Sequence, residues 1–565
     1  MTRIYDIAHQ YVDDLAAIDP STATALGIPG REREMPDYSP AGYARTADLN
    51  RRTLEALEAA PIEGDASVPQ GERDRIAKEM ISERLRVSLD LYDAGEHMRG
   101  LRIIGAALQR CRSIFDDMPK TTGEEWSNIA ARLALVPEAL SGYRTTLDEG
   151  IARGSTASKR QAVECAKQAE TWAGLVDGHR SYFDGLAEAL DKGEVGTEAV
   201  RTDAGRGVRL AKEAFASMGT YLRDGYAPKA SEREASGEER YHLLTRLFLG
   251  AEIDLKDTYD WGWEQLHDLE EQMEKTAQRI KRGASIDEAT DLIENDPVRS
   301  VDGVEAYREW LQGLHDEALA ALHGKHFDIP EEIRRIQVMI PPAGSAAAAY
   351  YTGPSEDFTR PGRTWWPTMG RTRFPKWGDV TTAYHEGVPG HHLQVGGARC
   401  LGDTLSRYQR LLGFISGYGE GWALYSERLM GELGYLEEPD AYMGLLSAQA
   451  LRAVRVIIDI GMHLELPIPA TETFHPGETW SHDLAVEFST QKTRRPREFM
   501  ASEVVRYLGW PSQAISYKVG ERFWLEAREG AKQKAGGSFD LRAFHSAALD
   551  LGPMGLAQLQ RELGG

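Results

Sequence analysis

With 565 residues and 41% hydrophobic content, the chain is long enough to bury one or more large cores. Its 66 basic and 88 acidic residues give a formal net charge of −22, which argues against nucleic acid or an anionic membrane as a partner, because phosphate contacts depend on clustered Lys and Arg. Cys111, Cys165 and Cys400 lie far apart and lack C-x-x-C spacing, so neither a disulfide framework nor a thiolate zinc site is indicated.

The first 20 residues carry Asp6, Asp13 and Asp14 among their apolar residues, which leaves no uncharged run for a signal peptide. No run of about 18 apolar residues occurs in the sequence, so we predict no transmembrane helix. A cytoplasmic location without a membrane partner is therefore expected. The sequence does not indicate the oligomeric state.

Helical periodicity begins at the N-terminus. Apolar residues recur at helical spacing over residues 2–18, and Pro20 should end this helix, with a loop rich in Gly, Pro and charge to about residue 40. Amphipathic segments then follow one another to about residue 226, among them residues 76–92, 126–147 and 200–222. Their Trp, Tyr and Leu residues are interpreted as core positions.

A longer helix is predicted over residues 259–282, where apolar residues form one stripe and charges occupy the other faces. Ser285 and Glu288 have the spacing of a capping box, which predicts the start of another helix. Pro297 should end that helix, because proline cannot continue the hydrogen-bond pattern.

Two short strand patterns come next. Residues 336–340 are rich in β-branched side chains and are bounded by prolines, and residues 346–352 lead to a Gly-Pro break. Such strands would either offer an edge to an extended peptide or brace a neighbouring helix as a small hairpin. Residues 360–367, rich in Arg and Trp, are expected to form an ordered loop suited to the wall of a cleft.

Residues 384–394, Y-H-E-G-V-P-G-H-H-L-Q, concentrate groups that can bind a metal. His385 is followed directly by Glu386 and then by two further imidazoles, and Glu420 comes later in G-Y-G-E-G-W. A catalytic zinc needs such N and O ligands, an acid/base group and an open position for water. We therefore predict a site for one Zn²⁺ here. A polar helix end is the ordinary alternative.

The stretch departs from the H-E-x-x-H signature of helical metalloproteases at one place. Pro389 occupies the position of the second His, and the next imidazoles, His391 and His392, follow His385 by six and seven residues. On an ideal helix these spacings correspond to a rotation of about 240° and a rise of about 10 Å, so neither could share a metal with the first ligand. A distortion at Pro389-Gly390 would let His391 take the second position, with His392 as the alternative.

Four residues farther along stand three or four apart on one helical face: Arg452, Arg455, Asp459 and His463. If this face is exposed, it is an ordinary solvated face. If it lines a cleft, an Arg could bind a substrate carboxylate, or Asp459 and His463 could support the metal ligands. Pro511 is well placed as the first residue of a last long helix, on which Tyr517 lies on a mixed face.

H-E-G-V-P-G-H-H-L-Q followed by G-Y-G-E-G-W-A-L-Y-S-E resembles the bacterial family catalogued as domain of unknown function 885, which is itself similar to the gluzincin zinc peptidases. Further similar blocks extend the resemblance over nearly the whole chain, at residues 349–351, 357–362, 452–463, 513–520 and 539–545. After His463, members of the family commonly continue with Gly-Trp, whereas this chain has L-E-L-P.

The expected fold is mainly α, a large multi-helix protein with a small β element next to the metal-binding helix. The resemblance implies a central cleft between two lobes. We expect one peptidase-like unit over residues 1–565, with a mostly helical N-terminal lobe over 1–270 and a metal-binding catalytic lobe over 271–565.

The predicted function is zinc-dependent cleavage of peptide bonds, in oligopeptides. His385, His391 and Glu420 would hold the metal, and Glu386 would act as the general base. The resemblance implies that Tyr517 donates to the developing oxyanion, as late tyrosines do in related peptidases.

Other interpretations stay open. His463 and Arg360 are the next candidates for the oxyanion donor. The same ligands would serve a hydrolase of non-peptide amides or esters, and a non-catalytic metal-binding protein is a third possibility. Glu386 argues against the last, because a purely structural metal site has no use for an uncoordinated base.

Overall fold

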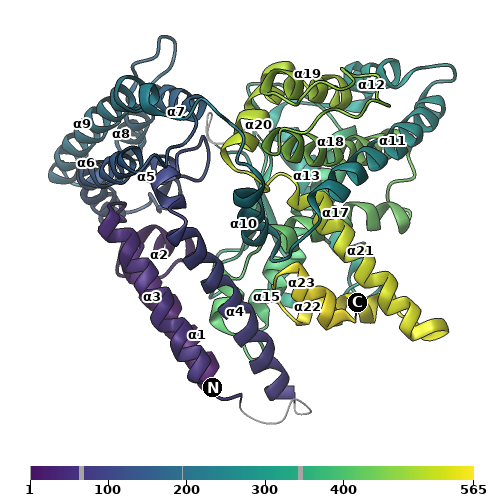
Figure 1. The fold of residues 1–565 in the computed structure, drawn as a ribbon, viewed down its shortest axis with the longest axis horizontal. Helices are drawn as coiled ribbons and strands as arrows, with labels where there is room; N and C mark the ends of the chain where they lie inside the picture. Colours follow the sequence, from purple (N-terminus) through teal and green to yellow (C-terminus); the bar gives the residue numbers. More distant parts are fainter. Residues whose placement is uncertain (1, 63–68, 194, 342–347, 565) are drawn as a thin grey trace. The chain divides into compact units, whose positions relative to one another are not determined.

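The computed structural model describes residues 2–62, 69–193, 195–341 and 348–564 (Figure 1). Helices account for most of these residues, and the strands are few and only three or four residues long. The mainly α-helical fold with a small β element is therefore confirmed. Within the described ranges, no helix is long and apolar enough to cross a membrane.

Contacts divide the chain into two compact units. The first contains Met1–Pro61, Ser82–Ala235 and Ser502–Trp510, and the second contains Ile62–Ile81, Ser236–Ala501 and Pro511–Gly565. The boundary expected at residue 270 falls inside α11 (Leu255–Ile280), which belongs to the second unit. All of the predicted metal ligands lie in the second unit.

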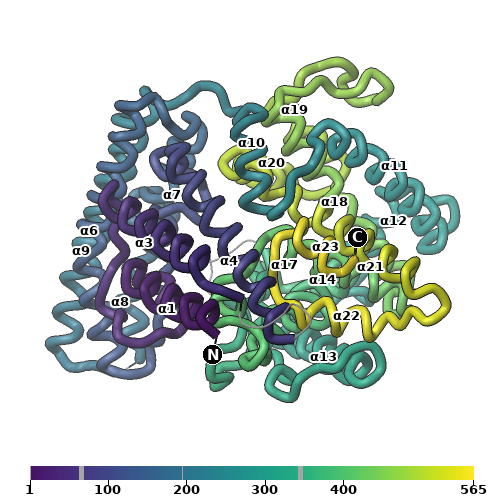
Figure 2. Tube along the Cα trace, turned by 60° about the horizontal axis from the view of Figure 1, so that its bottom comes forward, coloured from purple at the N-terminus to yellow at the C-terminus, as the bar shows by residue number. Residues whose placement is uncertain are grey.

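The first unit is built around a pair of long helices. α6 (Gly123–Ala152) and α9 (Glu198–Thr220) pack along each other, and their apolar faces contribute Trp126 and Phe215 to one large core. Figure 2 shows α1 and α3 of the same unit running side by side. The remaining helices are α1 (Arg3–Ile18), α2 (Pro20–Leu26), α3 (Pro40–Ala59), α5 (Ala107–Asp117), α7 (Lys159–Ala173) and α8 (Tyr182–Lys192).

The second unit surrounds α18 (Pro439–His463). From Met443 onward this helix is buried on nearly all of its faces, as expected where other helices enclose it. α11 and α14 (Trp377–Glu386) pack against it. The other helices are α10 (Glu238–Leu249), α12 (Ile286–Asn295), α13 (Val304–Leu322), α15 (Gly397–Cys400), α16 (Arg407–Leu412), α17 (Ser416–Glu432), α19 (His482–Thr493), α21 (Ser516–Ala535), α22 (Leu541–Asp550) and α23 (Leu556–Leu563). Two further helices, α4 (Pro69–Asp93) and α20 (Arg497–Gly509), contribute residues to both units.

Most of the predicted helices are confirmed, because α1, α4, α6, α9 and α11 cover the segments with helical periodicity. Ser285 and Glu288 form the expected capping box at the start of α12. The loop expected directly after Pro20 is wrong, since α2 begins there. The Asp19 carboxylate accepts the N–H of Ser21 at 3.0 Å, and Pro20 occupies the first helical position, where its missing N–H costs nothing.

A three-stranded sheet has the order β2–β4–β3. β2 (Ile336–Met339) runs parallel to β4 (Gly362–Trp365), and β3 (Tyr350–Thr352) runs antiparallel to it. β2 and β3 confirm the two strand predictions, although residues 346 and 347 of the second lie outside the described part of the chain. A separate antiparallel pair, β1 (Ser300–Asp302) with β5 (Arg373–Pro375), precedes α14.

The ordered loop expected over residues 360–367 is wrong, because β4 occupies its middle and forms the central strand of the sheet. Pro361 and Pro367 flank this strand and obscure it in the sequence, since proline is rare inside central strands. Gly362 and Thr364 are nevertheless buried, and the strand pairs with a neighbour on each side.

The expected helix start at Pro511 is also wrong, since residues 511–515 form turns and α21 begins at Ser516. Ser512 adopts a left-handed conformation with φ of 70°. Its N–H donates to the buried carboxylate of Asp459 at 2.9 Å. This hydrogen bond stabilises the turn, so that α21 begins at Ser516 and not at Pro511.

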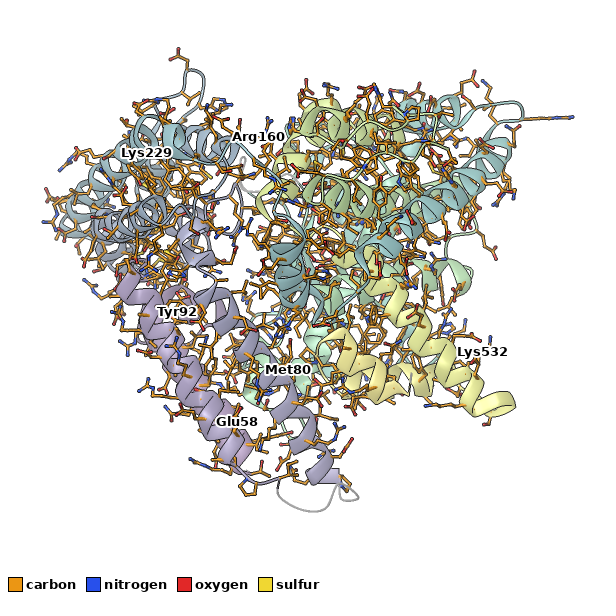
Figure 3. All side chains as sticks on the ribbon, in the orientation of Figure 1. Glu58, Met80, Tyr92, Arg160, Lys229 and Lys532 are labelled. Atoms are coloured by element: carbon orange, nitrogen blue, oxygen red, sulfur yellow. The ribbon has the colours of Figure 1, made fainter. Side chains whose placement is uncertain are left out.

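α17 and α21 approach each other closely at glycines (Figure 1). A Cβ added to Gly520 would lie 2.1 Å from the carbonyl O of Gly417, and one added to Gly421 would lie 2.4 Å from the carbonyl C of Gly520. Two helices can approach this closely only where side chains are absent. The contact places the start of α21 beside the start of α17, while the far end of α21, where Figure 3 labels Lys532, is exposed to solvent.

Gly520→Ala should therefore destabilise the second unit by about 1–3 kcal/mol, because the new methyl group has no space between the helices. We expect a lower midpoint in chemical denaturation followed by circular dichroism. Gly313→Ala, in the middle of α13, is the matched control, since nothing lies within 4 Å of the added Cβ. That control should gain about 0.5–1 kcal/mol from helix propensity, and equal losses in both variants would contradict the argument.

Candidate metal centre

The predicted metal-binding motif lies where α14 ends. The helix stops at Glu386, the Val388-Pro389 peptide is cis, and the N–H of Gly390 donates back to the carbonyl O of Tyr384 at 3.0 Å. A Cβ on Gly390 would lie 2.0 Å from the carbonyl O of His385, so only glycine fits this turn. The distortion expected at Pro389-Gly390 is thus a complete break of the helix, followed by a π-turn over His392–Gly396.

The break brings three of the predicted residues together. His385, His391 and Glu420 each offer one ligand atom, and these atoms lie within 4.8 Å of one another. Nε2 of either imidazole is 3.4 Å from Oε2 of Glu420. These separations suit zinc, because two tetrahedral ligands at ordinary zinc distances lie about 3.3 Å apart. The three residues therefore fit the donor set of a catalytic zinc.

His392 points elsewhere. Its Nδ1 accepts the hydroxyl of Tyr351 at 3.0 Å, and its Nε2 donates to the carbonyl O of Ile333 at 2.7 Å. Burial lowers the pKa of His392 to about 4, so the ring is neutral. Both of its nitrogens are occupied by the protein, which leaves His391 as the second imidazole of the group.

A fourth residue, Glu427, supports the group and was not predicted. Its Oε1 accepts from Nδ1 of His385 at 2.7 Å, and its Oε2 accepts the hydroxyl of Thr381 at 2.6 Å. The hydrogen bond fixes the tautomer of His385 so that Nε2 faces the metal position. Glu427 follows Glu420 by two helical turns on α17, and this seven-residue spacing is the signal that could have identified it.

The ionisation of the cluster follows from its burial and its close pairs. Burial alone would lower the pKa of His385, but hydrogen bonds to Glu420 and Glu427 raise it to about 9. Burial would raise the pKa of Glu420, but the two imidazoles hold it well below its usual range. Glu386 differs, because burial is the dominant influence and raises its pKa. Glu386 is therefore more easily protonated than Glu420.

A cavity of about 500 Å³ opens onto the cluster, and Glu386 and Tyr517 both line it. The ring of Tyr517 stacks on His385 with centroids 6.3 Å apart. Arg455 and Arg452 lie over the same ring, with Cζ at 4.8 and 5.6 Å from its centroid. The predicted oxyanion donor thus lies beside the metal position.

The face of α18 that carries Arg452 is not solvated. Arg452 and Arg455 line the cavity and are mostly buried. Asp459 and His463 are fully buried away from it: Asp459 accepts from the hydroxyl of Tyr241 at 2.6 Å, and His463 accepts the N–H of Ser236 at 3.2 Å. The two residues therefore do not support the metal ligands.

Neither His463 nor Arg360, the alternative oxyanion donors, is among the described residues that line the cavity. Tyr517 is the candidate that reaches it. All five predicted site residues therefore line the same cavity: Glu386, Tyr517, His385, His391 and Glu420.

The family model of a bacterial protein of unknown function (DUF885) matches residues 20–563. None of the curated proteins matches the chain. Two solved structures are similar over the full chain. One is a candidate lipoprotein from Colwellia psychrerythraea, with 20% identity, a TM-score of 0.84 and 99% of that protein covered. The other is a candidate lipoprotein of unknown function from Shewanella oneidensis, with 16% identity, a TM-score of 0.72 and 100% of that protein covered. At these identities the likeness concerns the fold alone.

The geometry distinguishes the two adjacent imidazoles. His391→Ala should remove zinc from the purified protein, because it deletes one of three ligands. His392→Ala should retain zinc and lower the melting temperature, since two buried hydrogen bonds are lost. Metal analysis by plasma emission spectroscopy after dialysis measures the first effect. Zinc loss in His392→Ala with retention in His391→Ala would reverse the assignment.

Proposed function

We propose that the chain, which belongs to the bacterial DUF885 family, is a zinc-dependent hydrolase of peptide bonds in oligopeptides. The observation that carries the proposal is the position of Glu386, a buried carboxyl group that lines the cavity but does not belong to the convergent group of His385, His391 and Glu420. A structural metal site would close its fourth position and would not need this group.

His385, His391 and Glu420 would hold the metal. When bound, zinc supplies a Lewis acid that polarises a carbonyl group and makes water nucleophilic near neutral pH. Glu386 takes a proton from the attacking water and returns it to the leaving amine. Its raised pKa suits this double role, because a carboxylate of ordinary acidity holds a proton too weakly. Tyr517 donates its hydroxyl to the oxygen on which negative charge develops.

A peptide substrate is favoured by the sheet beside the cavity. β3 is an edge strand of the sheet, and its Tyr350 and Tyr351 line the cavity. An extended peptide can add to such an edge through main-chain hydrogen bonds. The carbonyl of the Gln394 side chain, which is buried and has no donor among the described residues, offers a further acceptor for a substrate N–H.

The gluzincin resemblance of the motif agrees with this proposal. The description as a lipoprotein belongs to the two similar proteins. A cytoplasmic location for this chain stays a prediction. Hydrolysis of non-peptide amides or esters is the alternative, since the same ligands permit it. A panel of oligopeptides tested beside small amides and esters separates the two.

The first test separates the base from the ligands. Glu386→Gln should keep stoichiometric zinc and lower peptide hydrolysis by about 10²–10⁴-fold, because the amide cannot accept the proton. Glu420→Gln should weaken zinc binding itself. Zinc content and turnover of a quenched fluorescent peptide are measured on both variants. Equal zinc loss in the two would show that the roles are misassigned.

The second test concerns the oxyanion donor. Tyr517→Phe keeps the ring between His385 and the arginines and removes only the hydroxyl. Turnover should fall by roughly 100-fold or more with zinc content unchanged. If the hydroxyl has only a structural role, the variant would instead lose about 1 kcal/mol of stability and keep near-normal turnover.

A further inference from the structure

The cavity beside the candidate metal centre is rich in arginine. Among the described residues that line it, four are Arg and two are Glu, and none is Lys or Asp. The chain as a whole has a net charge of −22, so this local excess of positive charge departs from the rest of the molecule. A bound divalent cation would increase the excess.

The four arginines form two pairs with different neighbours. Arg452 and Arg455 lie over Tyr517, which stacks on His385. The other pair, Arg399 and Arg410, lines the cavity together with Tyr351 and Phe414. The rings of these two aromatic residues lie 6.5 and 6.3 Å from that of His391.

Arg399 and Arg410 line the cavity from two different elements of the fold. The side chain of Arg399 packs over Gly353, just after β3, so that a Cβ added there would lie 3.1 Å from its Cζ. Arg410 lies on α16, four residues before Phe414, which follows the end of this helix and also lines the cavity. Both arginines therefore line the cavity together with Tyr351 and Phe414, the two aromatic residues near His391.

These two side chains have little compensating charge. One carboxylate, Glu356, lies 3.7 Å from Arg410 and also interacts electrostatically with Arg399, but it makes its shorter contact, 3.2 Å, with Arg407. In Arg399 and in Arg410 the Nε atom is buried and has no acceptor within the described residues. Buried donors without an acceptor are costly, and a guanidinium pair is suited to hold an oxyanion in two-point contact.

We infer that Arg399 and Arg410 form a subsite that binds a carboxylate group of the peptide substrate in this cavity. The inference rests on the proposed function for the cleavage, but the subsite itself is independent of the metal. The carboxylate comes either from the peptide C-terminus or from a Glu or Asp side chain, since both present the same planar group.

Binding of peptides to the zinc-loaded full-length Glu386→Gln protein tests the inference without turnover. The probes are N-acetyl-Ala-Glu-Ala, its C-terminal amide, and N-acetyl-Ala-Gln-Ala, measured by isothermal titration calorimetry. Replacing the carboxylate that the subsite uses should weaken binding about ten- to a hundredfold. The probe that loses affinity identifies the source of the carboxylate.

Arg399→Gln and Arg410→Gln, each added to this protein, should abolish the difference between the probes. Arg373→Gln, an exposed arginine outside the cavity, removes the same charge and should leave the difference intact. Melting temperature and zinc content confirm that each variant is folded. Either arginine variant alone tests the inference. If one of them does not fold, the affinities measured with the other decide the result.

Two outcomes overturn the inference: equal affinity for all three probes, or a difference that survives both arginine substitutions. Hydrolysis of all three peptides at equal rates by the unsubstituted enzyme would uphold the proposed function while refuting the subsite. If binding of the probes depends on a carboxylate and on the two arginines but none of the probes is hydrolysed, the subsite is upheld and the proposed function is refuted.

Discussion

The geometry of the site depends on one backbone constraint, the break of α14 after Glu386. Two imidazoles six residues apart cannot meet on a regular helix, whose geometry turns them to different faces. The chain instead turns back at Gly390, so closely that a Cβ there would overlap the carbonyl groups of His385 and Tyr384 in the last helical turn. Because no residue with a Cβ fits there, the convergence of His385 and His391 depends on this glycine.

Buried charges hold the remaining groups in place. Glu427 is enclosed between α14 and α18 and binds both Thr381 and His385. Next to Tyr517, the ammonium group of Lys518 donates to Gln449 at 2.5 Å and to Glu521 at 2.6 Å. Burying such charges is costly unless every partner is present. The network therefore favours the one arrangement of these side chains in which each charge has its partners. It therefore fixes the start of α21 and, with it, the position of Tyr517.

Much of this could be predicted from the sequence, because helical periodicity and the His-Glu motif are local signals. The same logic would have identified Glu427, two turns after Glu420 on one face. β4 could not be recognised, since the prolines around it argue against a strand and only its two neighbours make it one. The start of α21 was mispredicted because Asp459, distant in sequence, captures the N–H of Ser512.

The arginines of the cavity show a second limit of prediction from the sequence, which concerns charge. A net charge of −22 argues against partners that cover a large surface, such as nucleic acid, because they respond to the summed charge. Charges on the outer surface are screened over about 8 Å at physiological ionic strength, so they say little about a small ligand inside a cavity. There the field is set by the nearest side chains, and Arg399 and Arg410 come from two short helices whose placement no local pattern reveals. An acidic protein can therefore bind an acidic substrate, provided that recognition occurs at contact distance.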